Sequence, residues 1–258
     1  MSARKPEMGK YLLYRFFAKD KHVRRYLPET TRYTHASLKQ YMRRYGMVYV
    51  KPCAGSQGKG ICKVWTTKHG YMVKKNVYAQ RACSSLDDVT RYLDEVRDGK
   101  AYIVQQGIHL AKYKGKPFDI RVMMQRDRPG GKWQFSGMVA KVAGGNSIVT
   151  NTALSHGTVI DVDVALANAL GWKQEKCKKC MQKLEQLGFL AARHFDNYQK
   201  YRELGFDAAV DVKGKVWLIE QNTAPSHRLF ARNKQSPGLF RRIEYRWGAY
   251  HRAKAKRA

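Results

Sequence analysis

The chain has 258 residues, of which 43% are hydrophobic and 12% aromatic, so it is too apolar for a disordered protein and long enough for one sizeable core or two lobes. Fifty Lys and Arg against twenty Asp and Glu give a net charge of +30, which favours a polyanionic partner but is uninformative about the fold. Five scattered cysteines argue against a disulfide framework, and we see neither an apolar run of membrane-spanning length nor an apolar leader, so we expect a cytoplasmic protein.

In the first half of the chain, a basic and aromatic segment at residues 1–35 contains a predicted helix at 11–19. A helix at 37–44 and a strand at 47–51 follow, and residues 61–67 and 71–75 are expected to form a hairpin. The next helix is predicted to begin after Ser84 or Ser85, either of which can cap it. It should run to residue 97, because its apolar residues recur on one face.

The second half of the chain shows the same alternation of element types. Strands are predicted at 102–105, 119–126 and 133–142, a long helix at 177–202, and a final hairpin with strands at 206–212 and 216–220. Residues 231–258 are expected to form a basic tail, since positions 241–258 hold seven Lys or Arg and a single Glu. Strands interleaved with helices predict an α+β enzyme rather than a bundle or a sandwich.

A glycine-rich stretch follows the strand at 47–51. Between Lys51 and Ile61, glycines at 55, 58 and 60 would let the backbone approach a ligand closely and direct its N–H groups at phosphate. The spacing fits neither a Walker A loop nor a dinucleotide-binding fingerprint. By itself the stretch is equally compatible with a plain hairpin turn.

The final predicted hairpin carries oxygen ligands. Asp207 on its first strand is expected beside Glu220 on its second, and Glu220 and Asn222 share one face because they are two residues apart. Two carboxylates and an amide oxygen suit a magnesium ion that bridges nucleotide phosphates. A solvated acidic hairpin is the alternative, and it is disfavoured because Glu220 ends an apolar run in a chain poor in acids.

Two predicted strands place charged side chains among apolar ones. Asp119 and Arg121 alternate along one strand, and Lys141 interrupts another strand that is otherwise apolar. A cation on a buried face needs an anion, and phosphate is a good candidate. The alternative is an ordinary Asp–Arg pair with a lysine that reaches solvent.

Taken in order, these features resemble the ATP-grasp superfamily. The resemblance is greatest to its spore-coat-associated YheC/YheD-like branch, and weaker to the ribosomal-protein glutamate ligases and the D-alanine–D-alanine ligases. It covers roughly residues 35–230. It rests on Val50-Lys51-Pro52 with the glycine-rich stretch, Gln105-Gln106-Gly107-Ile108, Asp119-Ile120-Arg121, Asn151 with Gly157, Leu204-Gly205-Phe206-Asp207 and Glu220-Gln221-Asn222-Thr223-Ala224-Pro225.

The resemblance implies an ATP-grasp fold in which two α+β lobes clamp ATP, with a catalytic core at 36–230 and a hinge near 105–108. It implies ATP and Mg²⁺ as cofactors and a ligase that phosphorylates a carboxylate and then joins it to an amine. It assigns Arg121, Lys141 and Asn151 to catalysis and Asp207, Glu220 and Asn222 to the metal. The nucleotide would be held by Lys39, Lys51, Gly55, Ser56, Gln57, Gly58, Lys59, Gly60, Gln105, Gln106 and Ile108.

The expected partner follows from charge and from the position of the resemblance. Family members usually carry an N-terminal substrate domain, and only about 35 residues precede the resemblance here, so we expect that domain to be reduced or absent. With the charge of +30, this favours an acidic peptide, an acidic protein or another polyanion as substrate, and no membrane. An ATP-grasp phosphotransferase is the alternative enzyme. A basic nucleic-acid-binding protein with an ATP-binding core is the alternative from another class, and a homo-oligomer stays open.

Two further features carry less weight. Cys177 and Cys180 lack the second pair that a structural zinc site needs, and His194 is the one tempting extra ligand. We therefore interpret them as helical cysteines on a basic face. His227 follows the predicted metal end closely and could either contact substrate or be an ordinary loop residue.

Overall fold

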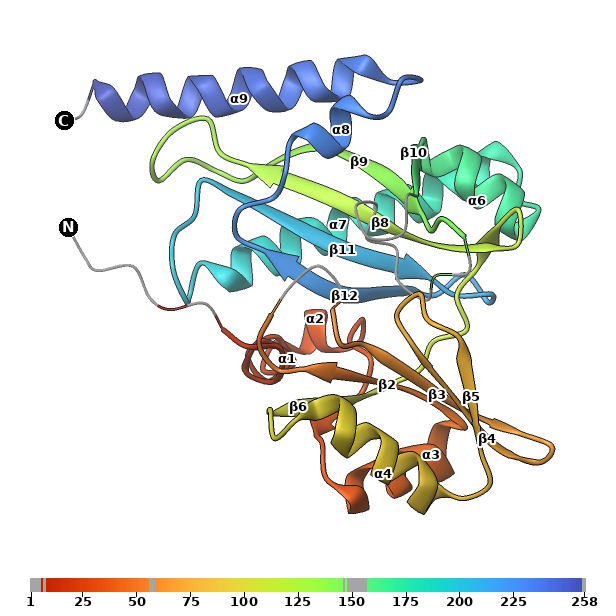
Figure 1. Ribbon diagram of the computed structural model, residues 1–258. Helices are drawn as coiled ribbons and strands as arrows, with labels where there is room; N and C mark the ends of the chain where they lie inside the picture. Colours follow the sequence, from red (N-terminus) through yellow and green to blue (C-terminus); the bar gives the residue numbers. More distant parts are fainter. Residues whose placement is uncertain (1–5, 7, 56–58, 146, 148–156, 257–258) are drawn as a thin grey trace.

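The computed structural model describes residue 6 and residues 8–55, 59–145, 147 and 157–256. These parts form two lobes, each built on an antiparallel sheet, and Figure 1 shows one lobe above the other. The α+β character predicted from the interleaved patterns is confirmed. Within the described ranges, no helix is both long and apolar enough to cross a membrane.

The lower lobe contains the first sheet, whose strand order is β1-β6-β2-β3-β4-β5. Figure 1 shows α3 and α4 on its outer face. In β2, Val48 and Val50 are buried against these helices, whereas Tyr49 and Lys51 face the other lobe, because successive side chains of a strand alternate. The elements are β1 (Thr30–Arg32), α3 (His35–Tyr45), β2 (Met47–Pro52), β3 (Cys62–Thr67), β4 (Gly70–Lys75), β5 (Gln80–Cys83), α4 (Leu86–Arg97) and β6 (Tyr102–Gln106).

Local sequence signals set the ends of both helices in this lobe. The side chain of Ser85 accepts a hydrogen bond from the backbone N–H of Asp88, and the Asp88 carboxylate accepts one from the backbone N–H of Ser85, which confirms the expected cap. Thr34 and Ser37 form the same reciprocal arrangement on α3. Helix α3 then ends at Gly46, whose φ of +65° is a left-handed conformation that glycine adopts without strain.

The chain passes from one lobe to the other directly after β6. Gly107 donates its backbone N–H to the carbonyl of Met47, and a β-carbon at this position would come within 2.6 Å of that carbonyl oxygen. Further along, the backbone of His109 accepts from Val212 and that of Ala111 donates to Val210. The crossing segment is therefore tied to strands of both lobes.

The upper lobe has three layers around the second sheet, whose order is β10-β9-β8-β11-β12 with β7 paired to β8. Helices α6 and α7 pack on one face and α8 and α9 on the other. On β8, Ile120 and Val122 join the larger core, and Met123 joins the smaller one. The elements are β7 (Lys112–Tyr113), β8 (Lys116–Gln125), β9 (Gln134–Val142), β10 (Thr158–Ile160), α6 (Val162–Leu170), α7 (Gln174–Phe195), β11 (Glu203–Val210), β12 (Val216–Asn222), α8 (Arg228–Ala231) and α9 (Pro237–Ala255).

The expected N-terminal helix is present, whereas the C-terminal segment differs from the expected basic tail. Helices α1 (Lys10–Ala18) and α2 (Lys21–Arg24) precede the first strand, yet they place Phe17 and Val23 in the core of the upper lobe. The expected tail is instead helix α9, and Ile243 on it is fully buried. Apolar residues at helical spacing anchor α9, and the many charges around them hide that spacing in the sequence.

Candidate active site

A cleft of about 480 Å³ lies between the two sheets. This volume is in the range of small-molecule binding sites. Its walls come from β2 and β6 of the lower lobe, from β8, β9, β11 and β12 of the upper lobe, and from α1. Among the described residues, five basic and three acidic side chains line it, so the cleft suits an anionic ligand.

Strand register brings the charged residues of the upper lobe together. Arg121 on β8 lies directly opposite Asp207 on β11, and Asp119 on β8 lies opposite Lys141 on β9. On each strand the neighbours of these residues belong to the larger core, so the charged side chains emerge on the other face, toward the cleft. Residues far apart in the sequence thereby form one compact group.

Asp207 is the centre of this group. Its Oδ1 atom accepts from Arg121 Nε at 2.6 Å and from Lys141 Nζ at 3.0 Å, and its Oδ2 atom accepts from the second Arg121 nitrogen at 3.0 Å. Lys141 also pairs with Asp119 at 3.0 Å. These side chains are at most 13% exposed, so the ion pairs are poorly screened by water.

The ionisation of these residues follows from their pairing. Burial alone would raise the pKa of Asp207, but Arg121 and Lys141 hold it well below its ordinary value. Burial alone would lower the pKa of Lys141 and of Arg121, yet the neighbouring carboxylates raise both. All three groups are therefore charged at neutral pH, and two cations face the cleft.

The three residues predicted to bind the metal lie together at this wall. Glu220 is directly opposite Asp207 across the β11–β12 pair, and Asn222 donates its side-chain nitrogen to Asp207 Oδ2 at 3.3 Å. Because Asn222 donates through its side-chain nitrogen, its amide oxygen can bind a ligand. The side chain of Glu220 is 37% exposed, so its carboxylate is accessible. The described residues contain no group of three His, Cys, Asp or Glu side chains placed as metal ligands. The predicted metal ligands are therefore two carboxylates and one amide oxygen, a set that fits a hard divalent cation.

The lower lobe contributes Lys51 and its support. Lys51 Nζ donates to Gln105 Oε1 at 2.6 Å, and Gln105 in turn donates to the Thr30 hydroxyl at 3.0 Å. Burial lowers the pKa of Lys51 to about 8, although Glu220 across the cleft opposes the shift. Gln105, Gln106 and Ile108, the expected adenine segment, all line the cleft, and the side chain of Gln105 also positions Lys51.

The glycine-rich stretch is described in part. Gly55 and Lys59 line the cleft, and Gly60 has a φ of +72° with Tyr102 only 2.7 Å from where a β-carbon would lie. Glycine is therefore required at position 60. The predicted residues Ser56, Gln57, Gly58 and Asn151 lie outside the described residues.

Two lysines differ from the sequence-based expectation. Lys39 is not among the residues that line the cleft; on α3 it pairs with Asp87 at 2.8 Å. Lys10, which the sequence analysis missed, donates to the Gly55 carbonyl at 2.6 Å and lies 3.5 Å from Glu220. No spacing rule links Lys10 to either partner, because all three meet only when α1 packs between the lobes.

The chain resembles known ATP-grasp proteins in sequence and in fold. A model of the YheC/D-like ATP-grasp family matches residues 4–245. The chain belongs to the YheC/D-like ATP-grasp family. It is 28% identical over 255 residues to the endospore coat-associated protein YheD of Bacillus subtilis (strain 168), an alignment that covers 96% of this chain and 55% of YheD. The chain therefore spans about half the length of this YheC/D-like relative.

Two solved structures resemble this ATP-grasp chain in fold. The C-terminal domain of Pby1 from K. lactis, an ATP-grasp enzyme interacting with the mRNA decapping enzyme Dcp2, has a TM-score of 0.54 at 15% identity over 92% of this chain and 69% of that one. D-cycloserine synthetase DcsG has a TM-score of 0.54 at 10% identity over 90% of this chain and 69% of that one. At these identities the likeness concerns the fold alone, and it confirms the expected ATP-grasp architecture.

The residues to which the sequence analysis gave less weight do not line the cleft of this ATP-grasp protein. Cys177 and Cys180 lie on the buried face of α7, within the larger core, and not on a basic face. His194 approaches the backbone carbonyl of Phe16 at 3.0 Å. His227 does not line the cleft, although the preceding residue, Ser226, does.

Proposed function

We propose that this ATP-grasp protein is an ATP-dependent ligase that joins a carboxylate to an amine through an acyl phosphate. The observation that carries the proposal is the buried group of Arg121, Lys141 and Asp207 on one wall of the interlobe cleft, opposite Lys51. Described residues of this cleft supply cations and hydrogen-bond donors where phosphoryl transfer needs charge neutralisation. Neither a Ser–His nor a Cys–His pair is needed for this chemistry.

In the proposed reaction the substrate carboxylate attacks the terminal phosphate of ATP, and the bond to ADP breaks. The amine then attacks the acyl carbon, phosphate leaves with the bonding electron pair, and the amine gives up a proton. Arg121 and Lys141 would stabilise the negative charge that redistributes on the phosphoryl oxygens. Asp207 keeps both cations charged and aimed at the cleft, while Lys51 would bind phosphates already charged in the ground state.

A divalent cation would be held by Glu220 and Asn222, with Asp207 completing the set. When bound there, Mg²⁺ would neutralise part of the charge on the nucleotide phosphates. Glu220 has the more accessible carboxylate, because Asp207 already accepts from Arg121, Lys141 and Asn222. We therefore expect Glu220 to contribute most to metal affinity.

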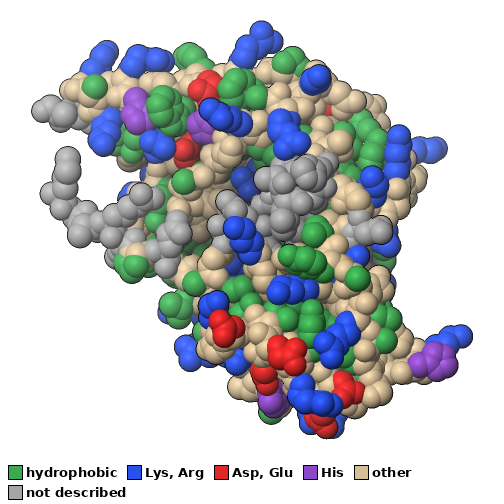
Figure 2. Space-filling model, viewed as in Figure 1, with side chains coloured by type: hydrophobic (Ala, Val, Ile, Leu, Met, Phe, Trp, Pro, Cys, Tyr) green, Lys and Arg blue, Asp and Glu red, His purple; other side chains and the backbone are tan. Residues whose placement is uncertain are grey.

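We propose an acidic peptide or protein as the substrate. The charge of +30 supports this proposal, and so does its distribution: Figure 2 shows basic side chains over both lobes, whereas most acidic side chains on this face gather on the lower lobe. Helix α9 adds further exposed basic side chains, and its Tyr245 is 71% exposed. The exposed basic residues of this helix are Arg241, Arg242, Arg252 and Lys254, and exposed Lys256 follows its last residue.

The decisive experiment supplies the protein with ATP, Mg²⁺, poly-L-glutamate and a mixture of amino acids. We expect ADP and phosphate in equal amounts and a polymer whose mass has grown by an amide-linked amino acid. Hydroxylamine in place of the amino acids should give a hydroxamate, because it traps an acyl phosphate. Lys141→Met should abolish all of these products, and Lys183→Met, which removes an exposed lysine on α7, should abolish none.

The other outcomes decide between the remaining functions. A phosphorylated polymer that accumulates without any need for an amine would identify a phosphotransferase. Absence of ATP turnover, together with tight binding of single-stranded DNA that weakens steeply with salt, would favour the nucleic-acid-binding alternative. A Michaelis constant for poly-L-glutamate that is independent of salt would contradict an electrostatic docking of the substrate.

A further inference from the structure

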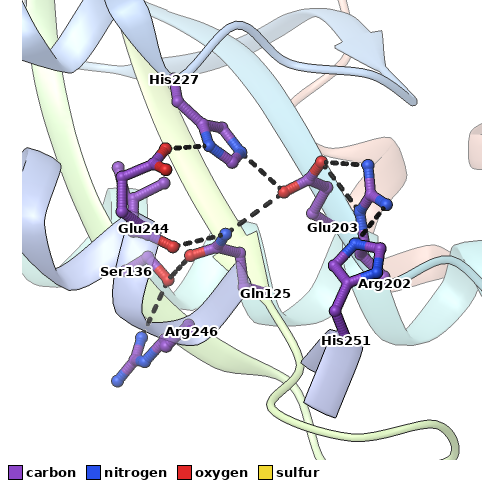
Figure 3. Close-up of polar contacts among 9 residues, drawn as sticks. Gln125, Ser136, Arg202, Glu203, His227, Glu244, Arg246 and His251 are labelled. Atoms are coloured by element: carbon purple, nitrogen blue, oxygen red, sulfur yellow. Dashed lines mark hydrogen bonds and ion pairs between the residues drawn. The ribbon is translucent and has the colours of Figure 1, made fainter. Parts of the chain in front are cut away.

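One face of the upper sheet carries a second polar group beside the active-site cluster. Figure 3 shows its labelled members, which we call the His227 cluster: Gln125, Ser136, Arg202, Glu203, His227, Glu244, Arg246 and His251. Gln125 and Glu203 are directly opposite each other on β8 and β11, as Arg121 and Asp207 are. Each strand separates the two groups by four residues, or about 13 Å at the usual rise, and both groups lie on the same face.

His227 is the centre of the second group. Its Nε2 atom lies 2.8 Å from Glu203 Oε2, and its Nδ1 atom lies 2.6 Å from Glu244 Oε1. Glu203 is only 4% exposed at the start of β11, whereas Glu244 belongs to α9. One imidazole therefore connects the sheet to the C-terminal helix, and Figure 3 shows it between the two carboxylates.

The remaining members fasten α9 to the sheet. Gln125 donates to Glu203 and to the backbone carbonyl of Ile243, both at 3.2 Å. Ser136 donates to Gln125 at 2.6 Å, and Arg246 donates to the Ser136 hydroxyl at 2.9 Å. With the backbone of α9 held in this way, Glu244 has a defined position from which to reach His227.

The segment that ends at His227 leads back into the active site. Residues 223–227 follow β12 directly, and Ala224, Pro225 and Ser226 line the cleft. A β-carbon at Gly205 would come within 2.7 Å of Pro225 Cβ and 3.1 Å of Arg121 Cδ. Pro225 therefore packs over Gly205, next to the side chain of Arg121, and its position depends on where the segment is fastened.

We propose that His227 is a positioning residue, which bridges Glu203 and Glu244 and so holds Pro225 against Arg121. Its effect on catalysis rests on the proposed ligase function, whereas its effect on Arg121 does not. His227 itself is no acid–base catalyst, because both ring nitrogens have carboxylate partners and the ring lies outside the cleft lining.

The bridge has a definite pH window. Around His227, Glu203 belongs to β11 and Arg202 directly precedes it, while Glu244 and His251 belong to α9. Burial alone would lower the pKa of His227, but its bonds to Glu203 and Glu244 raise it above 6.5. The stabilisation is therefore complete below 6.5 and is lost as the pH rises through the raised value. Burial alone would raise the pKa of Glu203, yet His227 lowers it below 4.5, so acid breaks the contact between His227 and Glu203 only below that.

The first test observes the protein without substrate. In NMR titrations, the imidazole signal absent from His227→Asn should give a pKa above 6.5 in the wild type and a lower one in Glu244→Gln. The Arg121 Nε–H signal, assigned with Arg121→Lys, should shift at the same pH as His227. Glu175→Gln, which removes an exposed carboxylate paired to Lys179 on α7, should leave both signals unchanged. An Arg121 signal that ignores the titration of His227 overturns the proposal.

The second test measures turnover at saturating nucleotide, so that titration of Lys51 does not intrude. Glu244→Gln should lower turnover about three- to tenfold and change nucleotide affinity less than twofold, since mutations that act through a positioned neighbour have effects of this size. Turnover should be lost at high pH, and in Glu244→Gln this loss should occur at a lower pH, in step with the lowered pKa of His227. Equal turnover and equal pH profiles in Glu244→Gln and Glu175→Gln would overturn the positioning role. If the wild type shows no turnover while Arg121 still responds to His227, the ligase proposal fails and the positioning role of His227 stands.

Discussion

The two walls of the cleft present different chemistry. The lower lobe offers a half-buried lysine, an amide partner and apolar surface, with Lys51 supported by Gln105 and few carboxylates nearby. The upper lobe offers a dense group of opposite charges around Asp207, in which every member has an ionic or hydrogen-bonded partner. The first wall offers an anion a lysine held by a neutral amide, whereas the second holds two cations in fixed positions by ion pairs with carboxylates.

We therefore expect the lower wall mainly to set nucleotide affinity and the upper wall mainly to set the rate. A phosphate that is charged before and after binding is served by a cation such as Lys51, which stabilises ground state and transition state alike. Charge that develops only during transfer is served by donors held rigidly in advance, as Arg121 and Lys141 are. Changes on the lower wall should therefore alter affinity, and changes on the upper wall should alter rate and stability.

The largest effect is expected from Asp207→Asn, which leaves Arg121 and Lys141 buried without their shared anion. The free energy of unfolding should fall by about 3–5 kcal/mol, the usual cost of removing one partner of a buried ion pair. Denaturation in urea would measure it. Asp87→Asn, which breaks the exposed pair with Lys39, should cost less than about 1 kcal/mol. Comparable losses in the two variants would mean that the upper wall is no more organised than the surface.

Glu220→Gln should have the next largest effect and should act on turnover. We expect a decrease of about 100-fold or more at limiting Mg²⁺, because a bound metal ion stabilises the transition state by several kcal/mol. Raising the Mg²⁺ concentration should restore part of the activity, which can be followed by ADP release. Glu185→Gln on α7 is the matched control. A Glu220→Gln enzyme with wild-type turnover at limiting Mg²⁺ would rule out the metal assignment.

The pH dependence of nucleotide affinity tests the lower wall. In the free protein the pKa of Lys51 is lowered to about 8. Above this pH, Lys51 loses the positive charge that a bound phosphate would stabilise. Binding should therefore take up a proton, and affinity should fall about fivefold between pH 8 and pH 9. Calorimetry in buffers of different ionisation enthalpy measures both quantities. Lys51→Arg should abolish the proton uptake because arginine stays charged, and uptake that persists in this variant would assign it elsewhere.

The smallest effect is expected from Lys10→Ala at the junction of the two walls. Lys10 holds the Gly55 carbonyl and approaches Glu220, but its side chain is 20% exposed. Loss of one such hydrogen bond should weaken nucleotide binding about threefold. Fluorescence titration with a labelled nucleotide would measure the change, with Lys19→Ala just beyond the same helix as control. Equal affinity in the two variants would show that α1 contributes only packing.

Much of the architecture could be predicted from the sequence, because it depends on neighbours along the chain. The helix that follows Ser85 begins where the cap was expected, and the strands at 47–51, 102–105 and 133–142 are present with small shifts at their ends. Alternation on β8 and β9 already separates Arg121 and Lys141 from the residues of the larger core. Periods of two and of three to four residues are local properties, so a single sequence reveals them.

The tertiary structure alone decided which of these residues meet. The sequence singled out Lys39 and overlooked Lys10, since only the packing of α1 between the lobes brings Lys10 to Gly55. It marked Asp207 as a metal ligand, whereas strand register also makes it the shared anion of Arg121 and Lys141. It treated the C-terminal residues as a tail, although α9 reaches back to His227. Such contacts depend on register and on the packing of distant segments, which local patterns do not determine.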